Sequence, residues 1–341
     1  SADKLPETGK HFPALKSFDE LMREFVRENK IPGAALAVAK DGRLVYARGF
    51  GYANRERKEP VRPDSLFRIA SISKSFTAVA TLQLIEQGKL KLDDRVFKLL
   101  PHKAHLPKGG KVDPRLNQIT IAHLMRHQGG WDRGESIDPM FHSIEIATTL
   151  GKKPPANKDD IVRFMKGWPL DFEPGTRYAY SNLGYCLLGR VIEQTTGKNY
   201  EKYIQAELLK PLGITRIRTG KTLPAHRAPG EVTYYPRGEL VGLAVTGPRI
   251  GAKVPRPYGA WNLESMDSLG AWIAAAPDLV RFVVTPPDEA PIGFSGFDKD
   301  LAISADGTLV VYSSTTSDER DTQLTVHRLS DLESVALRGT L

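Results

Sequence analysis

Residues 67–88 have the sequence FRIASISKSFTAVATLQLIEQG, which is typical of a helix from the interior of a globular protein. The segment is rich in Ala, Leu and Gln, which favour a helix, and Gly88 is suited to end it. Apolar residues fall on nearly every face, so only a narrow polar strip remains. We therefore expect a largely buried helix that carries Ser71 and Lys74 near its amino end.

Ser71 and Lys74 are three residues apart, so their side chains share one face of this helix. Unpaired amides and the positive end of the helix dipole favour an anion that develops at Ser71. Burial beside the serine would lower the pKa of Lys74, because a low-dielectric environment disfavours the ammonium form. The pair is thus a candidate activated nucleophile. The alternative is a helix cap with a nearby surface lysine, since S-x-x-K alone recurs by chance.

Tyr180 and Asn182 form a second candidate motif, after a Glu-Pro-Gly turn and before a helix that Gly197 ends. The tyrosine hydroxyl can exchange a proton with the serine or with a leaving group. The asparagine amide can donate a hydrogen bond to a substrate carbonyl. The alternative is a buried tyrosine followed by an asparagine that caps the helix.

In this order the two motifs resemble those of the serine β-lactamase and penicillin-binding-protein superfamily, in the branch of class C β-lactamases, family VIII carboxylesterases and D-alanyl peptidases. The resemblance covers residues 14 to about 285, and its segments are 31–54, 65–78, 90–101, 119–130, 172–197 and 208–215. It implies an α/β (α+β) fold with an antiparallel sheet flanked by helices, a mainly helical region, and the active site between them.

The resemblance also implies one hydrolase domain over residues 1–285. We expect its sheet to include a hairpin at 34–52 that turns at Asp41-Gly42, a favoured two-residue turn. Residues 90–267 would form the mainly helical region and its loops.

The same resemblance implies two-step acyl transfer through an acyl-enzyme on Ser71. Lys74 would activate the serine, Tyr180 would act as general acid and base, and Asn182 would contact the substrate. Because the base of the acylation step is disputed in related enzymes, Lys74 and Tyr180 are assigned jointly. Two amides would hold the tetrahedral oxyanion, one of Ser71 and one of a late strand.

A third family motif, Lys-Thr-Gly or His-x-Gly on a late inner strand, is incomplete here. The nearest candidate is Phe294-Ser295-Gly296, in which Phe replaces the cation and Ser295 and Gly296 would contact substrate. Loss of the cation would weaken binding of substrates with a free carboxylate, whereas neutral esters would suffer less. This departure favours a carboxylesterase of small esters with weak β-lactam hydrolysis. The alternatives are a β-lactamase or D-alanyl-D-alanine carboxypeptidase, and a non-catalytic penicillin-binding or scaffold protein.

From Pro291 onward the sequence resembles one repeat unit of a Tol-type β-propeller instead. Alternating apolar residues on both sides of Asp306-Gly307 predict a hairpin. We expect residues 286–341 to be a β-strand segment with strands near 300–305, 308–314 and 322–329. These strands would either complete the sheet of the hairpin or represent a truncated propeller blade.

A long stretch rich in Gly and Pro, residues 215–267, shows no strong periodicity. Its aromatic residues Tyr258 and Trp261, together with Tyr234 and Tyr235, are candidates for the wall of an acyl-binding cleft. The alternative is local packing of scattered loop aromatics.

Composition excludes several classes of function. The 341 residues are 40% hydrophobic and 26% charged, as in an ordinary globular protein. The net charge is +8, but the cations are scattered and not interleaved with aromatic residues, so a nucleic-acid partner is not expected. No apolar run is long enough for a membrane span. The expected partner is a small-molecule ester or β-lactam.

Cofactor motifs are also missing from the sequence. His123 and His127 have helical spacing but lack the glutamate and third ligand of a zinc site, and no glycine loop fits a nucleotide. The single Cys186 excludes an internal disulfide. The start at Ser1-Ala2-Asp3 fits a cleaved export signal or a shortened chain equally well, so we expect a bacterial protein, exported to the periplasm or cytoplasmic. The oligomeric state is left open.

Overall fold

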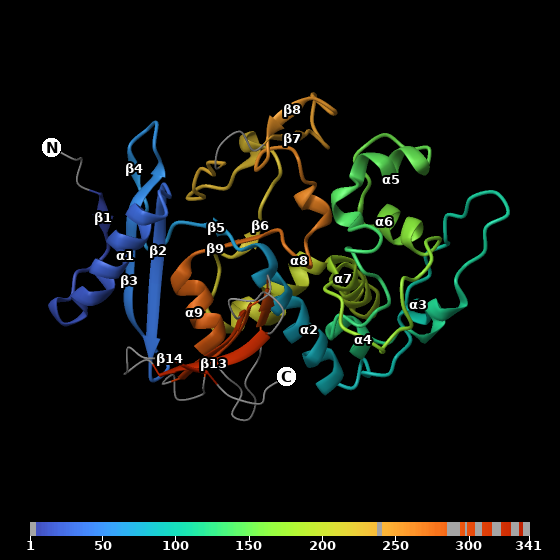
Figure 1. Ribbon diagram of the computed structural model, residues 1–341, viewed down its shortest axis with the longest axis horizontal. Coiled ribbons are helices and arrows are strands. Elements are labelled where there is room, and N and C mark those ends of the chain that lie inside the picture. Colours follow the sequence, from blue (N-terminus) through green and yellow to red (C-terminus); the bar gives the residue numbers. More distant parts are fainter. Residues whose placement is uncertain are drawn as a thin grey trace.

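The computed structural model describes residues 5–236 and 241–283 with their side chains, and further strands after them by backbone alone (Figure 1). The α-helices are α1 (Lys16–Glu28), α2 (Lys74–Glu86), α3 (Val96–Leu99), α4 (Ile121–Met125), α5 (Ser143–Thr149), α6 (Lys158–Met165), α7 (Asn182–Thr196), α8 (Tyr200–Tyr203) and α9 (Ala276–Val284). None of the helices in these ranges is long and apolar enough to cross a membrane.

The first sheet is antiparallel and has the order β1–β3–β2, with β4 paired to β3. Its strands are β1 (Glu7–Thr8), β2 (Gly33–Lys40), β3 (Arg43–Asn54) and β4 (Glu59–Pro60). The hairpin predicted at 34–52 is therefore confirmed. Asp41 and Gly42 both have positive φ, 50° and 70°, which matches the twist of a two-residue hairpin turn.

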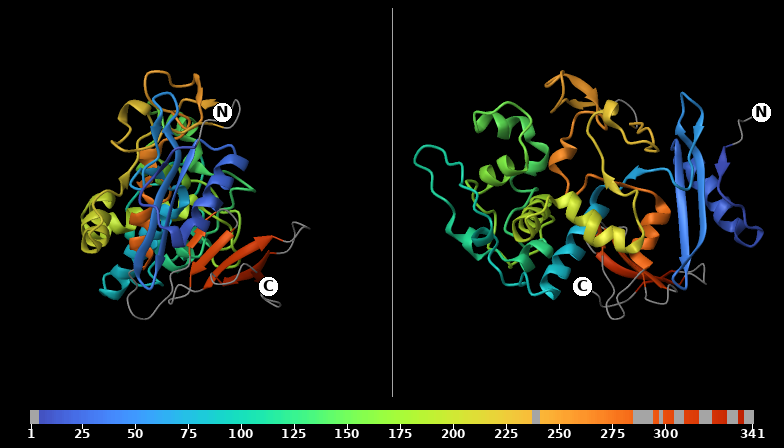
Figure 2. Two further views of the ribbon diagram at one scale, coloured as in Figure 1. Left: turned by 90° about the vertical axis from the view of Figure 1, so that its left-hand side faces the viewer. Right: turned by 180° about the vertical axis from the view of Figure 1, so that it is seen from behind.

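Helices cover both faces of this sheet. α1 packs on one face, where Met22 and Val26 join Tyr46 and Phe50 in a small apolar cluster. α9 packs on the other face, between the sheet and the rest of the molecule (Figure 1). The right-hand view of Figure 2 places the sheet and the helices α3–α6 at opposite ends, as Figure 1 does, with α2 and α9 between them. The predicted arrangement of a sheet flanked by helices beside a mainly helical region is confirmed.

The main core is built around α2 and α7. Phe76 on α2 is fully buried and makes edge-to-face contacts with Trp272 (5.3 Å between ring centroids) and Phe282 (4.8 Å). Trp272 lies on β9 (Trp272–Ala274), the middle strand of a three-stranded sheet with β5 (Phe67–Arg68) and β6 (Arg218–Thr219). Because β5 ends just before Ser71, this small sheet fixes the start of the segment that carries the serine.

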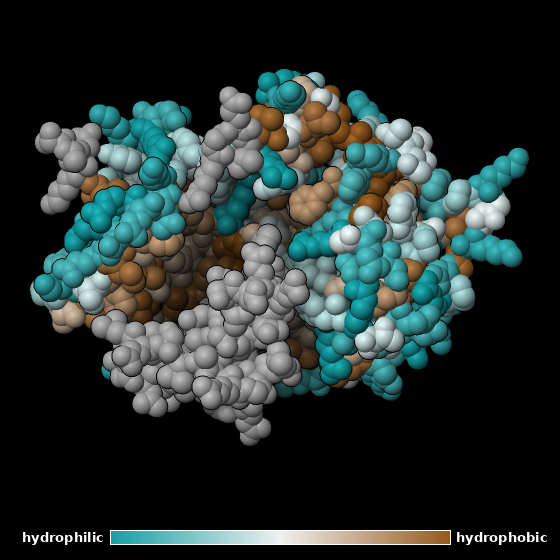
Figure 3. Space-filling model, in the orientation of Figure 1, coloured by the Kyte–Doolittle hydropathy of each residue, from teal (hydrophilic) through white to brown (hydrophobic). Residues whose placement is uncertain are grey.

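The region between α8 and β9 has few regular elements. It contains a π-helical turn at Ile204–Leu209 and a two-stranded sheet of β7 (Val241–Leu243) and β8 (Lys253–Pro255). In Figure 3 the surface is hollowed between the sheet side and the helical side, and the side chains in this hollow are predominantly apolar.

Five late strands form an antiparallel sheet of their own in the order β10–β14. They are β10 (Phe294–Gly296), β11 (Lys299–Ile303), β12 (Leu309–Thr315), β13 (Thr322–Arg328) and β14 (Ser334–Ala336). The strands predicted near 300–305, 308–314 and 322–329 are thus present. These strands were expected to complete the sheet of the 34–52 hairpin or to represent a propeller blade. They pair with one another instead, and no described strand pairing joins them to β2 or β3. A domain boundary at 285 and a propeller-blade origin stay predictions.

Candidate active site

Ser71 lies on a tight turn rather than within the α-helix predicted for its segment. It belongs to a 3₁₀ turn, Ala70–Ser73, and Lys74 is the first residue of α2. Ala70 has φ 45°, a conformation that non-glycine residues adopt rarely and that is often associated with functional sites. The amide of Ile69 donates to the carbonyl of Trp272 (3.0 Å), so the turn is tied to β9.

The three predicted catalytic side chains meet at this turn. Ser71 Oγ lies 2.6 Å from Tyr180 Oη, and Lys74 Nζ donates a hydrogen bond to Ser71 Oγ over 3.1 Å. Tyr180 comes from the loop before α7, far from the other two in the sequence. A nucleophile within hydrogen-bond distance of proton-exchanging groups is an arrangement that supports nucleophilic catalysis.

Lys74 is buried and its ammonium donors all have partners. Besides Ser71, Nζ donates to Asn182 Oδ1 (2.8 Å) and to the carbonyl of Leu269 (3.0 Å). Burial lowers the pKa of Lys74 to about 7, and the nearby charge of Asp138 opposes this shift. A large fraction of Lys74 is therefore neutral near neutral pH and able to accept a proton.

Asn182 links Lys74 to a carboxylate that the sequence analysis did not identify. Its Nδ2 donates to Asp138 Oδ2 over 2.7 Å, while its Oδ1 faces Lys74. Both ends of the amide are thus held by protein groups, and its predicted substrate contact stays a prediction. The helix cap of α7 is Ser181, whose Oγ accepts from the amide of Gly184 (3.2 Å).

Asp138 precedes a short 3₁₀ turn, Pro139–Phe141, whose Met140 amide donates to Asp138 Oδ1. Burial raises the pKa of Asp138, although hydrogen bonds from Asn182 and Met140 and the charges of Arg133 and Lys74 oppose the rise. No motif marks this residue. An aspartate before proline, which is typical of the start of a turn, is the one local signal.

The Tyr180 ring contacts a histidine and two cations, one of which is Lys74, with Nζ 4.8 Å from the ring centroid. The His127 ring stacks on the Tyr180 ring at 4.7 Å, and the guanidinium of Arg133 lies 4.7 Å from the Tyr180 ring centroid. Burial raises the pKa of Tyr180, so the group is a phenol near neutral pH. His127 accepts from the Ser181 amide through Nδ1 (3.1 Å), and burial with the charge of Lys74 lowers the pKa of His127 to about 4.

The other predicted substrate contacts are not joined to this group by any described hydrogen bond or ring contact. Tyr258 Oη accepts from the Tyr234 amide (2.7 Å), and Trp261 packs against Phe141 (6.3 Å between ring centroids). Their role in an acyl-binding cleft stays a prediction. The Ser295 side chain lies outside the described residues, and the substrate contacts predicted for Ser295 and Gly296 stay predictions. The backbone of β10, which includes both residues, lies beside the Ser71 turn.

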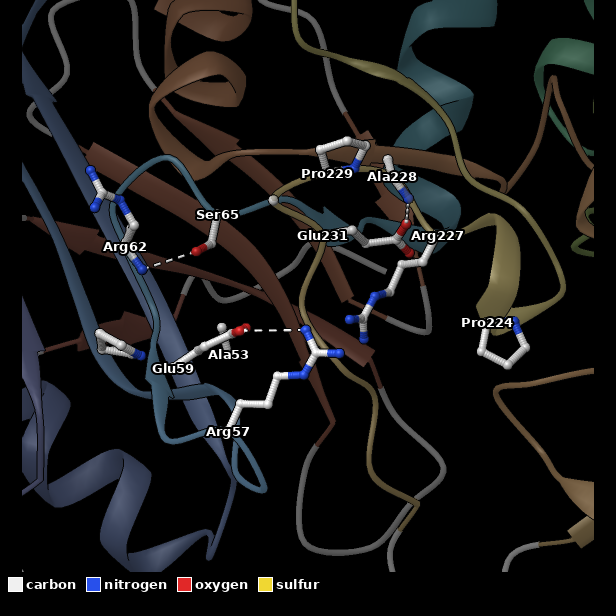
Figure 4. A pocket seen from close by; sticks show the side chains of 12 residues that line it. Ala53, Arg57, Glu59, Arg62, Ser65, Pro224, Arg227, Ala228, Pro229 and Glu231 are labelled. Carbon is white, nitrogen blue, oxygen red and sulfur yellow. Dashed lines mark hydrogen bonds and ion pairs between the residues drawn. The ribbon is translucent and has the colours of Figure 1, made fainter.

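A separate pocket of about 550 Å³ lies away from the Ser71 group (Figure 4). It is lined by segments 53–65 and 224–231, and Arg57, Arg62 and Arg227 border it. Glu231 lies at its wall, where its carboxylate accepts from the Ala228 amide (3.0 Å) and the Tyr234 hydroxyl (2.9 Å). The buried Glu231 is also an ion-pair partner of Arg68 (3.6 Å). The pocket is therefore next to β5, but it does not include Ser71, Lys74 or Tyr180.

Comparison with known proteins gives a family match over most of the chain. A family model described as Beta-lactamase matches residues 18–324. The match continues past residue 285, where the resemblance in sequence was expected to end. It therefore includes the strands β10, β11 and β12.

Two curated relatives and one solved structure illustrate the similarity. Protein flp of Staphylococcus aureus (strain COL) is 27% identical over 280 residues, which cover 80% of this chain and 50% of that protein. Esterase EstB of Burkholderia gladioli is 32% identical over 199 residues, 58% of this chain and 49% of that protein. The chain thus spans about half the length of the curated relatives it matches. The octameric penicillin-binding protein homologue from Pyrococcus abyssi superposes with a TM-score of 0.59 at 25% identity, covering 94% of this chain and 72% of that one.

Proposed function

The chain belongs to the beta-lactamase family, and on this basis we propose that it is a serine hydrolase that forms an acyl-enzyme on Ser71 and cleaves small carboxylic esters. The observation that carries the proposal is the position of Ser71 Oγ within hydrogen-bond distance of both Tyr180 Oη and Lys74 Nζ. The similarity to a relative named as an esterase supports the ester as substrate.

The two candidate bases have different environments, which supports different roles. Lys74, with a pKa near 7, accepts the Ser71 proton as Oγ bonds to the ester carbonyl carbon. Tyr180, whose pKa is raised, stays a phenol and gives a proton to the departing alkoxide as the carbon–oxygen bond breaks. Lys74 keeps the Ser71 proton through this first step, and Tyr180 is left as a phenolate. In the second step Tyr180 takes a proton from the attacking water, and Lys74 returns its proton to Ser71 Oγ as the acyl bond breaks. Water attacks the acyl-enzyme in the second step, which releases the acid and restores the Ser71 hydroxyl.

Backbone amides would stabilise the tetrahedral intermediate. The amide of Ser71 is one candidate donor, and the other comes from β10, whose backbone lies beside the Ser71 turn. Phe294, at the start of β10, supplies no cation. β10 therefore offers no cation to a substrate carboxylate at the place where the family's third motif would bind one.

A second candidate function is a penicillin-binding protein that is acylated without turnover. The incomplete third motif favours it, as does the similarity to a structure described as a penicillin-binding protein homologue. The two candidates differ in the second step, so they are separated by measuring deacylation.

The test uses p-nitrophenyl butyrate and, separately, a chromogenic cephalosporin. Wild type should hydrolyse the ester, and Ser71→Ala should lose this turnover. Ser75→Ala, one helical turn further on, is the matched control and should keep it. A stable mass adduct on Ser71 without turnover would favour the second candidate. Full ester turnover in Ser71→Ala would overturn both.

A further inference from the structure

Arg133 is an exposed cation placed directly against the catalytic tyrosine. It lies in the loop between α4 and the Pro139–Phe141 turn, and its guanidinium carbon is 4.7 Å from the Tyr180 ring centroid. Tyr180 Oη in turn lies 2.6 Å from Ser71 Oγ. The charge of Arg133 therefore sits one side chain away from the reacting oxygen.

The acidic neighbours of Arg133 are engaged by a different arginine. Arg177 donates to Asp132 Oδ2 (2.7 Å) and to Glu135 Oε1 (2.6 Å), the carboxylates on either side of Arg133 in the chain. The loop is fixed further by the Asp132 amide, which donates to Asp171 Oδ2 (2.7 Å). In the part of the chain that the structure describes, no carboxylate lies within ion-pair distance of the Arg133 guanidinium. The charge of Asp138 is near enough to interact with Arg133, but no described hydrogen bond uses the guanidinium donors. An arginine on a fixed loop whose donors have no described partner is suited to bind an anion.

The proposed reaction places the leaving group of the substrate near Arg133. Tyr180 is the group that protonates the departing oxygen, so the leaving group passes the phenol against which Arg133 is stacked. Lys74 cannot serve as the anion-binding cation, because its three donors are already paired within the protein. Phe294 supplies no charge from β10.

We propose that Arg133 binds a carboxylate on the leaving group, so that this chain selects esters whose alcohol half is anionic. The proposal rests on the proposed function and extends it. Arg133 would thus supply, from the loop after α4, a positive charge that the third motif lacks because Phe294 replaces its cation. Neutral esters remain substrates, but they forgo one charge-assisted contact.

The experiment compares two esters with one acyl group and one type of chromophore. These are 4-nitrophenyl butyrate and its analogue with a carboxylate on the nitrophenol ring, 5-butyryloxy-2-nitrobenzoate. The quantity measured is the ratio of kcat/KM for the anionic ester to that for the neutral ester. Arg133→Met should lower this ratio about ten-fold or more, the range expected for a hydrogen bond to a charged group. Arg133→Lys should lower it less.

Arg126→Met is the matched control, because it removes an exposed arginine from the end of α4 without a described contact to Tyr180. It should leave the ratio unchanged. Added salt should reduce the ratio in wild type but not in Arg133→Met. If the esters acylate the protein without turnover, the rate of adduct formation by intact mass replaces kcat/KM.

A ratio that Arg133→Met leaves at the wild-type value would overturn the proposal. An equal drop in Arg126→Met would also overturn it, since the effect would then come from net charge. Ester cleavage that persists in Ser71→Ala would instead mean that the proposed function has failed. A third ester, 4-nitrophenyl hemisuccinate, carries its carboxylate on the acyl half and is measured with the same variants. A dependence on Arg133 confined to that ester would contradict the assignment to the leaving group.

Discussion

Lys74 is the residue whose environment sets the pH range of the proposed reaction. Burial lowers its pKa to about 7, whereas the Asp138 carboxylate, held behind Asn182, favours the charged ammonium. Below this pKa the amine is protonated and cannot accept the proton of Ser71. Activity should therefore rise with pH and level off above about pH 7.

We predict that kcat/KM for p-nitrophenyl butyrate follows an acid limb with a midpoint near pH 7. Asp138→Asn should move that limb to lower pH, because it removes a charge that favours the ammonium while keeping an acceptor for Asn182 Nδ2. The measurement is a pH–rate profile for each variant. Asp159→Asn, an exposed carboxylate that pairs with His102, is the control and should not move it. A midpoint that moves to higher pH in Asp138→Asn would contradict the effect of the Asp138 charge on the pKa of Lys74.

Tyr180→Phe should separate the two proton transfers. The variant removes the hydroxyl that faces Ser71 but keeps the ring that contacts His127 and Arg133. We expect kcat/KM to fall about 10²–10⁴-fold, the usual contribution of a positioned acid or base. The loss should be larger for an ethyl ester than for a p-nitrophenyl ester, because the poorer leaving group needs the proton more. Tyr178→Phe, an exposed neighbour, is the control. Equal losses for both esters would mean that Tyr180 does not protonate the leaving group.

The proposed catalytic residues were predicted from the sequence because two short motifs, in this order, resemble those of a known superfamily. The spacing of three residues predicts that Ser71 and Lys74 share one face, and the 3₁₀ turn that Ser71 occupies keeps them together. That Tyr180 would join them was implied by the resemblance. Asp138 and Arg133 were not predicted. Their relation to the site depends on how residues 131–142 fold against α7, and no period or spacing in the sequence encodes that contact.

At the scale of elements, the buried helix of residues 67–88 was predicted, but its strained entry was not. The turn at Ala70–Ser73 is held by the bond from Ile69 to Trp272, a residue about 200 positions later in the chain. Such a long-range tie overrides local helix propensity at the end of an element. The caps of α4 and α6, by contrast, follow from local side chains, Thr120 and Asn157.

α7 lies so close to the segment before β9 that we expect Gly189 to tolerate no larger side chain. A Cβ on Gly189 would lie 2.4 Å from the Ser268 Cβ, so Gly189→Ala must displace that segment. The next residue, Leu269, accepts a hydrogen bond from Lys74. We expect a loss of about 1–3 kcal/mol in the free energy of unfolding, as for other overpacked cores, together with a lower kcat.

Two variants make this prediction specific. Gly184→Ala, earlier in α7, meets its nearest neighbour at 3.5 Å, so we expect no destabilisation from it. Ser268→Gly removes the displaced side chain and should restore stability to Gly189→Ala in the double variant. Urea unfolding and ester turnover are the measurements. A Gly189→Ala protein as stable and active as wild type would show that the segment moves at little cost.

At the scale of the whole molecule, α9 joins the sheet to the helical half. It packs on β2 and β3, and its Phe282 contacts Phe76 of α2. The sequence predicted both halves, since the hairpin and the long helices are locally encoded. It predicted the late strands but not their pairing, because the choice of partner strand depends on which edges are near in space. The family match, which runs to residue 324, extends over β10–β12.

Phe282→Ala should weaken both halves together. Phe282 is 8% exposed, and truncation of such a core phenylalanine costs about 3–5 kcal/mol in the free energy of unfolding. All four tryptophans, Trp131, Trp168, Trp261 and Trp272, lie outside the sheet of β1–β4, so their fluorescence reports on the helical half. Hydrogen exchange of β2 and β3 amides reports on the sheet. We expect the urea midpoint of the fluorescence and the protection of these amides to fall in parallel.

The control is Val283→Ala, the next residue on α9, whose side chain is 40% exposed. It should change both measurements little, because its neighbours in the core are fewer. Phe282→Leu should lie between Phe282→Ala and wild type, since part of the volume is kept. If β2 and β3 keep wild-type protection while the fluorescence midpoint falls, the two halves unfold independently. The catalytic turn, which lies between the halves, would then owe its geometry to β9 rather than to the sheet across α9.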